Sequence, residues 1–177
     1  GFIVDLWLTQ DSGYHVYCNG VSGWKGKLLG IEEIRGTNYS DTFVGSTSAD
    51  TIRGGAGNDT FRGLGGDDTF YGEGGDDLFI SSYNDGNNTY YGGTTDEVNG
   101  DTVDYSGITD NQYKVIGDLS NSTISVYNSL KKKKKTDTIY DIENLTGGSG
   151  DDTLTGNGSK NTIKGGDGND TIYVTAG

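Results

Sequence analysis

The sequence has no proline and no methionine, and its 177 residues include one cysteine, Cys18, and one histidine, His15. A single cysteine permits no internal disulfide. One histidine with one cysteine is too few for the usual zinc sites and leaves no His-Glu-x-x-His motif. A serine nucleophile in a Gly-x-Ser-x-Gly setting is missing as well. We therefore expect no catalytic residues in this chain.

Apolar residues are also scarce, at 31% of the chain, and no apolar run is long enough for a membrane span or a signal peptide. Asp and Glu number 26 against 13 Lys and Arg, and the resulting formal net charge of −13 disfavours nucleic acid as a partner. Low hydrophobicity with high charge is typical of disordered chains, unless metal binding supplies the missing drive to fold. Because there is no initiating methionine, we expect a piece of a longer protein.

Glycine is abundant instead, with 32 residues, and much of it falls in a repeat of nine residues. The pattern Gly-x-x-Gly-x-Asp-x-apolar-x occurs three times in succession, at 54–62, 63–71 and 72–80. It returns in full at 147–155 and 165–173, and weaker copies start at Gly36, Gly45 and Gly156. The eighth place is apolar in every copy: Phe43, Ile52, Phe61, Phe70, Phe79, Leu154, Ile163 and Ile172. At this apolar content the chance probability is roughly 10⁻⁴, so the period is secure.

The repeat brings together the groups that a hard cation needs. Glycines at the first, second and fourth places permit positive φ and a close approach of the backbone to an ion. Their carbonyl oxygens and the sixth-place carboxylate are hard ligands. Calcium takes about six to eight oxygens, which one such loop cannot supply but two stacked loops can. Since successive side chains of a strand face opposite ways, we expect one inward side chain per repeat, that of the eighth place.

Four segments follow from the pattern. Leading strands or a hairpin occupy 1–35, a first repeat block 36–93, a strand-rich insert with a lead-in 94–146, and a second repeat block 147–177. A shift of 111 residues (142 − 31) places Ile31 on Ile142 and Asp59 on Asp170. Hairpin, lead-in and repeats thus occur twice, which indicates an internal duplication.

The stretches 36–80 and 147–173 resemble the RTX (hemolysin-type) calcium-binding nonapeptide repeats of secreted bacterial proteins. The lead-ins Ile31–Gly36 and Ile142–Gly147 are similar to segments that precede such repeats. The resemblance implies an all-β fold, a right-handed parallel β-roll (β-solenoid) in two stacked segments with an intervening strand-rich insert. It also implies two nonapeptides per turn, so that calcium lies between loops about eighteen residues apart.

The metal ligands that this resemblance implies are loop carbonyls and sixth-place carboxylates: Asp41, Asp50, Gly54, Ala56, Asp59, Gly63, Gly65, Asp68, Gly72, Gly74, Asp77, Gly147, Ser149, Asp152, Gly165, Asp167 and Asp170. The implied pairs are 41/59, 50/68, 59/77 and 152/170, which predicts several calcium ions, roughly four. Asp59 belongs to two pairs, and we expect its two carboxylate oxygens to face the ions on either side. Asn161 replaces the carboxylate and should weaken its site.

The expected function is that of a calcium-binding structural module in a larger secreted or bacterial cell-surface protein, such as a surface-layer, matrix or adhesin scaffold. The resemblance implies export and folding on calcium binding outside the cell. The alternatives are the non-catalytic RTX module of a secreted hydrolase or epimerase, and part of a pore-forming toxin. Besides calcium, cell-surface polysaccharide and copies of the chain itself are candidate partners.

Three further features have a structural and a functional interpretation. Fifth-place Asp67, Asp76 and Asp151 face solvent if adjacent side chains diverge, the alternative being extra metal ligands. The run Lys131–Lys135 is interpreted as a solvated hairpin tip, the alternative being a grip on anionic polysaccharide or lipid. His15 lies in a strand-like stretch and is expected to be structural or exposed.

Overall fold

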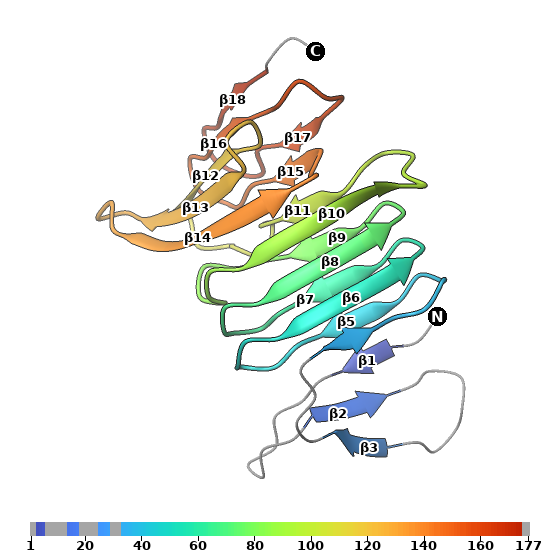
Figure 1. Cartoon of the computed structure of the whole chain (residues 1–177). Coiled ribbons are helices and arrows are strands. Elements are labelled where there is room, and N and C mark those ends of the chain that lie inside the picture. The colour runs from blue at the N-terminus through green and yellow to red at the C-terminus, as the bar shows by residue number, and fades with distance from the viewer. Residues whose placement is uncertain (1–2, 6–13, 18–24, 29–32, 175–177) are drawn as a thin grey trace.

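The computed structural model describes residues 3–5, 14–17, 25–28 and 33–174, and their side chains from residue 33 onward. Cys18 and the side chain of His15 therefore lie outside the described part. The regular structure of the described residues is all β, and no helix there is long and apolar enough to cross a membrane. Strands of two long sheets alternate along the chain and stack into a roll, shown in Figure 1.

The first long sheet, sheet I, has seven strands, all parallel. In spatial order they are β1 (Ile3–Asp5), β5 (Thr42–Val44), β7 (Thr60–Arg62), β9 (Leu78–Ile80), β11 (Thr102–Asp104), β15 (Asn144–Thr146) and β17 (Thr162–Lys164). The register places Thr42 opposite Thr60, so each turn of the roll holds two nonapeptides.

The second long sheet, sheet II, has nine strands and lies on the other side of the roll. In spatial order they are β18 (Thr171–Tyr173), β16 (Thr153–Thr155), β12 (Tyr113–Asp118), β13 (Thr123–Asn128), β14 (Lys133–Tyr140), β10 (Thr89–Thr95), β8 (Thr69–Gly74), β6 (Thr51–Ala56) and β4 (Ile34–Arg35). A separate antiparallel hairpin joins β2 (Tyr14–Tyr17) to β3 (Lys25–Leu28).

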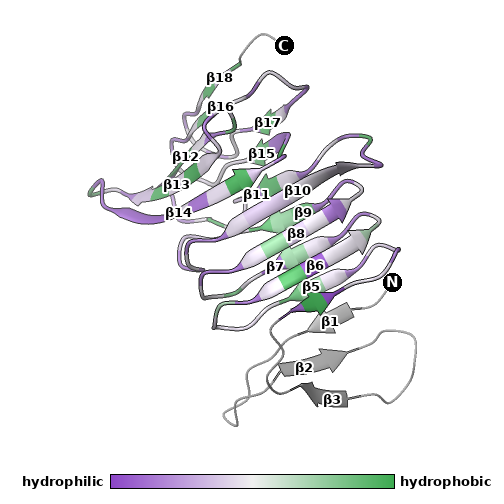
Figure 2. Cartoon of the chain, in the orientation of Figure 1, coloured by the Kyte–Doolittle hydropathy of each residue, from purple (hydrophilic) through white to green (hydrophobic). Residues whose placement is uncertain are grey.

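The core is thin. Eighth-place residues form it within the first block, as the repeat predicts, whereas other apolar side chains such as Tyr105, Ile108 and Val126 fill it around the insert. Phe61 stacks between Phe43 and Phe79 on sheet I, with ring centroids 5.1 and 4.9 Å apart. Phe70 and Tyr90 stack on sheet II, and Figure 2 shows the apolar band along the middle of the strands. The burial fades at the C-terminal end, where Ile172 is 43% exposed because no further coil covers it.

The two repeat blocks lie in one continuous sheet. In sheet I, β11 pairs with β9 of the first block on one side and with β15, in the lead-in, on the other, and β15 pairs with β17 of the second block. The middle of the insert enters sheet II only: β12, β13 and β14 form an antiparallel meander that pairs in parallel with β16 at one edge and β10 at the other. Figure 1 shows its β13–β14 end projecting from the roll. The insert therefore widens one face without interrupting the stack.

Candidate metal centres in the stacked loops

The loops between the two sheets stack in two columns, and hydrogen bonds between sixth-place residues connect each loop to the next. The Asp41 backbone N–H donates to Asp59 Oδ1 at 2.7 Å, and the Asp59 N–H donates to Asp77 Oδ1 at 2.7 Å. In the other column the N–H of Asp50 donates to Asp68 Oδ1 at 2.9 Å. The pair Asp152 and Asp170 repeats this bond at 2.9 Å. The loops that the sequence pairs are thus adjacent in space.

The second oxygen of four sixth-place carboxylates has no hydrogen-bond partner although it is buried. These atoms are the Oδ2 of Asp59, Asp68, Asp77 and Asp101. Buried polar atoms are nearly always satisfied, so four orphans of the same kind in stacked loops indicate a missing cation. In each loop a Cβ on the first-place glycine would overlap this oxygen: Gly54, Gly63, Gly72 and Gly92. Glycine there keeps the space beside the carboxylate free.

Backbone carbonyls of the next coil reach the same space. The Gly72 carbonyl oxygen lies 2.9 Å from the position that a Gly54 Cβ would take, beside Asp59 Oδ2. The Gly92 carbonyl oxygen lies 2.6 Å from the corresponding position on Gly72, beside Asp77 Oδ2. Carboxylate and carbonyl oxygens from two coils therefore converge, which is the all-oxygen donor set that calcium prefers.

The electrostatics of these loops require a cation. Burial, opposed by a backbone hydrogen bond and assisted by neighbouring carboxylates, raises the pKa of Asp59 and of Asp77 to about 7. Burial likewise raises the pKa of Asp68 and of Asp101 to about 8. For Asp152 the same effect is smaller, to about 6, since the N–H groups of Val115 and Gly148 stabilise its anion. Without an ion the charged form of the loops is therefore disfavoured.

The backbone conformation of the second-place residue distinguishes two kinds of loop, which we call open and closed. In open loops this residue has positive φ, as Gly55 (111°), Leu64 (72°), Glu73 (75°) and Gly93 (139°) do, and the sixth-place Oδ2 has no donor. In closed loops the second-place N–H donates to that oxygen: Thr37 to Asp41, Ser46 to Asp50 and Gly148 to Asp152. Leu64 and Glu73 accept a conformation that costs a non-glycine residue about 1–2 kcal/mol, and such strain clusters at functional sites.

The geometry bears on the expected roles of Asp59 and Asp41 as metal ligands. Asp59 Oδ1 accepts the Asp41 N–H, whereas its Oδ2 has no hydrogen-bond partner, so the two oxygens are not equivalent; that both face ions stays a prediction. Asp41 already accepts hydrogen bonds from the Thr37 N–H and hydroxyl. The glycines Gly147 and Gly165 lie beside Asp152 and Asp170 respectively, as the paired loops require.

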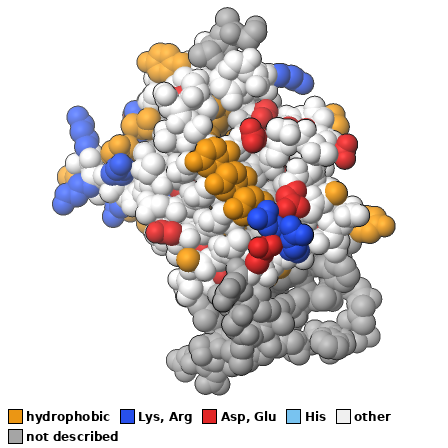
Figure 3. All heavy atoms as spheres, viewed as in Figure 1, with side chains coloured by type: hydrophobic (Ala, Val, Ile, Leu, Met, Phe, Trp, Pro, Cys, Tyr) orange, Lys and Arg blue, Asp and Glu red, His pale blue; other side chains and the backbone are white. Residues whose placement is uncertain are grey.

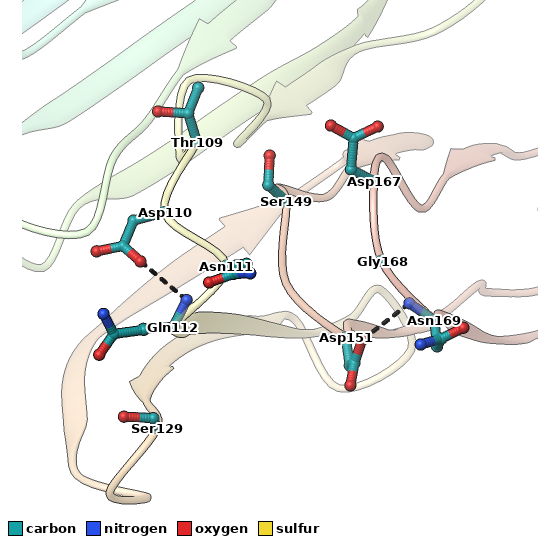
Figure 4. Close-up of a pocket in the computed structure, with 10 residues that line it drawn as sticks. All are labelled: Thr109, Asp110, Asn111, Gln112, Ser129, Ser149, Asp151, Asp167, Gly168 and Asn169. Carbon is teal, nitrogen blue, oxygen red and sulfur yellow. Dashed lines mark hydrogen bonds between the residues drawn. The ribbon is translucent and has the colours of Figure 1, made fainter.

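The remaining predicted ligands occupy less central positions. Third-place Ala56 and Gly65 donate their N–H groups to carbonyls of the preceding coil, at 3.0 Å each, and Gly74 pairs with Ala56 in sheet II. Ser149 and Asp167 line an open polar hollow that the 109–112 loop also borders, shown in Figure 4. Their role as metal ligands stays a prediction.

Fifth-place carboxylates bind backbone N–H groups. Asp67 accepts from Asn87 at 2.8 Å and Asp151 from Asn169 at 2.9 Å, and both acids are exposed. Asp76 accepts from three consecutive N–H groups, those of residues 98–100. Partial burial alone would raise the pKa of Asp76, but these hydrogen bonds lower it below its ordinary value. The solvent-facing interpretation holds for Asp67 and Asp151, and all three acids connect neighbouring coils.

A buried lysine, which the sequence reasoning missed, occupies one coil of sheet II. Lys135 is 3% exposed, and its Nζ lies 2.8 Å from Asp137 Oδ2, 2.8 Å from Ser81 Oγ and in contact with Asp85 Oδ1. Tyr105 donates its hydroxyl to the same oxygen of Asp137. The solvated-tip interpretation is therefore wrong for Lys135, although residues 131–134 are exposed. The alternation along β14, which buries positions 135, 137 and 139, gives the reason.

These loops define a class of protein: a parallel β-roll whose coils hold cations between them. The family model for the RTX calcium-binding nonapeptide repeat matches residues 35–69, 55–81 and 141–177, in 4 copies. These stretches of the chain are thus RTX calcium-binding repeats, and such repeats bind calcium, in several ions. A comparison with curated proteins found no match. Residues 82–140, which include Asp101 and Lys135, lie outside the matched stretches.

Proposed function

We propose that the chain is a calcium-dependent structural module of a larger secreted or cell-surface bacterial protein, such as a surface-layer, matrix or adhesin scaffold. The observation that carries this proposal is the set of four buried carboxylate oxygens without partners, all in loops that stack on one another. An ion between coils satisfies these atoms and cancels their mutual repulsion. The ions then supply the folding energy that a thin core lacks.

The extracellular setting follows from the same energetics. Folding of loops that hold several buried carboxylates remains unfavourable until calcium binds. Extracellular modules bind calcium with dissociation constants of about 10⁻⁴–10⁻³ M, so the ion must be present near that concentration. A chain of this kind stays unfolded where calcium is scarce and folds where it is plentiful. Folding after export, with no catalytic step by this chain, is therefore part of the proposal.

Circular dichroism of the full chain in chelator and in millimolar calcium tests the proposal. We expect little β structure in chelator, a cooperative gain with calcium, and a much smaller gain with magnesium, because magnesium demands a tight octahedron and holds its waters. Identical spectra in chelator and calcium would overturn the proposal. Turnover of a protein, ester or glycan by the purified chain would overturn its non-catalytic part.

A surface row of stacked tyrosines supports a role in contact with other molecules. Tyr91 lies between Tyr71 and Tyr140, with ring centroids 4.7 Å apart on both sides. The Arg53 guanidinium covers the free face of Tyr71 at 3.9 Å and pairs with Glu73. Figure 3 shows a row of hydrophobic side chains on this face with charged groups at its end. Aromatic rows with charged ends suit polysaccharide or a second copy of the chain.

The partner part of the proposal has its own test. Tyr140→Ser should weaken retention on cell-wall polysaccharide, or self-association in sedimentation, in the calcium-loaded state. Tyr173→Ser is the matched control, because Tyr173 is 56% exposed and lies outside the row. Equal behaviour of both variants and the unsubstituted chain would remove the row from the proposal.

A further inference from the structure

A cluster of three carboxylates lies outside the nonapeptides, where the first block meets the second. Glu97, Asp101 and Glu143 each place a carboxylate oxygen within 4.8 Å of the others. Glu97 and Asp101 belong to the loop that leads from β10 to β11, and Glu143 directly precedes β15. Neither the repeat pattern nor its period places these glutamates at a metal.

The fold holds this loop in place. Asp76 accepts hydrogen bonds from the N–H groups of residues 98–100, at 2.8 to 3.0 Å. The Asn144 amide donates to the carbonyl oxygens of Asn99 and Gly100, at 3.0 Å each. Glu143 Oε2 accepts the Asp101 N–H at 2.9 Å, the bond that sixth-place aspartates make elsewhere. These hydrogen bonds fix the backbone on both sides of the cluster, so the fold itself brings the three acids together.

Unpaired buried atoms point into the cluster. Asp101 is fully buried, and its Oδ2 has no hydrogen-bond partner. Glu97 Oε1 is buried without a partner as well. A Cβ on Gly92 would overlap both Asp101 Oδ2 and the Asp141 carbonyl oxygen, so these two oxygens flank the same small space. One buried and two half-buried carboxylates, with a carbonyl oxygen beside them, form the oxygen-rich and acidic surroundings that a hard cation prefers.

We propose that Glu97, Asp101 and Glu143, with the Asp141 carbonyl oxygen, form a calcium site distinct from the repeat sites. A repeat loop offers one buried carboxylate from its sixth place, whereas this site gathers three from two coils. Its charge makes it the tightest calcium site of the chain. Because its ligands come from the loop that follows the first block and from the lead-in that precedes the second, the ion joins the two ends of the insert at the point where the blocks adjoin.

Calorimetric titration of the full chain with calcium tests this site. The double variant Glu97→Gln/Glu143→Gln keeps the size of both side chains and the acceptor for the Asp101 N–H, while it removes two charges. We expect one ion fewer than in the unsubstituted chain, and the loss of the highest-affinity step. Asp96→Asn, an exposed acid of the same loop, is the control and should retain both the ion count and that step.

The single variant Glu97→Gln guards against a general folding defect, because Glu97 lies in a loop and its removal leaves every strand pairing intact. It should weaken the tightest step at least tenfold, while circular dichroism at saturating calcium stays unchanged. An unchanged ion count and first step in the double variant would overturn the inference, and so would an equal loss in Asp96→Asn. An unsubstituted chain that binds no calcium at all would instead overturn the proposed function.

Discussion

The open loops and the Lys135 coil solve one electrostatic problem in two ways. The open loop of Asp68 and the Lys135 coil belong to the same hydrogen-bonded column, since the Asp68 N–H donates to Asn88 Oδ1 at 3.0 Å and the Asn88 N–H donates to Asp137 Oδ1 at 2.7 Å. In the open loops an orphan carboxylate oxygen awaits an ion, whereas in the next coil the ammonium of Lys135 contacts Asp137 and Asp85. The roll therefore needs a cation beside each of these buried acids, but the cation need not be a metal.

The source of the cation decides which parts of the roll respond to solution conditions. A lysine is tethered to the coil and remains present in chelator, and the hydroxyl of Tyr105 further satisfies the acid that it neutralises. The centre of sheet II is thus metal-independent, while the open loops before it, which include Asp59 and Asp77, depend on calcium. This difference leads to four predictions, which follow from the largest expected effect to the smallest.

The largest effect concerns pH in the absence of calcium. The folded-state pKa is about 7 for Asp59 and Asp77 and about 8 for Asp68 and Asp101, against an ordinary value of 3.8. Between these values the folded chain binds more protons than the unfolded chain, so stability falls as pH rises from about 4 to about 8. In chelator we therefore expect more β structure at pH 5 than at pH 8, where little should remain.

Calcium should cancel this dependence, because ions replace the protons on the open loops. Circular dichroism spectra at pH 5, 6, 7 and 8, in chelator and in saturating calcium, give the measurement. A β content in chelator that rises between pH 5 and pH 8 contradicts the assignment of the open loops as cation-deficient.

The next effect concerns the ammonium itself. Lys135→Met keeps the length of the side chain but leaves Asp85 and Asp137 buried without their cation. Removal of one partner of a buried ion pair costs about 3–5 kcal/mol. We expect that loss in urea unfolding in saturating calcium. Lys134→Met, one residue away and exposed, should change stability by less than about 0.5 kcal/mol. Equal losses in the two variants would show that Lys135 is not the cation of this coil.

A third effect separates open from closed loops. Asp59→Asn keeps an acceptor for the Asp41 N–H but places an amide where the ion would lie, so one calcium ion should be lost in titration. Asp41→Asn should lose no ion, because the Thr37 N–H and hydroxyl already occupy that oxygen. Its cost is a mispaired buried amide, about 1–3 kcal/mol. If Asp41→Asn loses an ion and Asp59→Asn does not, the open and closed assignments are reversed.

The sequence predicts the roll well because its signal is local and repeated. Eighth-place residues such as Phe43, Phe61 and Phe70 are buried as their period requires. The coils between the two repeat blocks do not follow the nonapeptide pattern, because their turns have other lengths. A shorter pattern, Asp-Thr-apolar, marks them nonetheless, since 101–103 and 137–139 repeat the triplet of 59–61. That triplet finds the sixth-place acids Asp101 and Asp137 without the glycines.

The rest of the site depends on contacts that no local pattern encodes. Whether a loop is open or closed depends on the φ of its second residue, and Leu64 and Glu73 adopt a region that their side chains disfavour. The contact of Lys135 with Asp85 spans 50 residues of chain, and the Asp101 to Glu143 hydrogen bond spans 42. Such pairings follow from the stacking of coils around the insert, which the composition of the insert does not reveal.

The smallest effect compares two neighbouring acids on one loop. Asp67 is exposed, and its Oδ1 accepts the Asn87 N–H at 2.8 Å, so Asp67→Asn keeps the acceptor and removes a charge that water already screens. We expect a change in stability within about 0.5 kcal/mol and an unchanged ion count. Asp68→Asn alters the adjacent buried carboxylate, whose Oδ2 lacks a partner, and should remove one ion. Both variants make the net charge less negative by one, so titration of the pair separates the position of a charge from its mere presence. Equal ion counts in the two variants would mean that calcium responds to the overall charge of the roll and not to the oxygen that the sixth place turns inward.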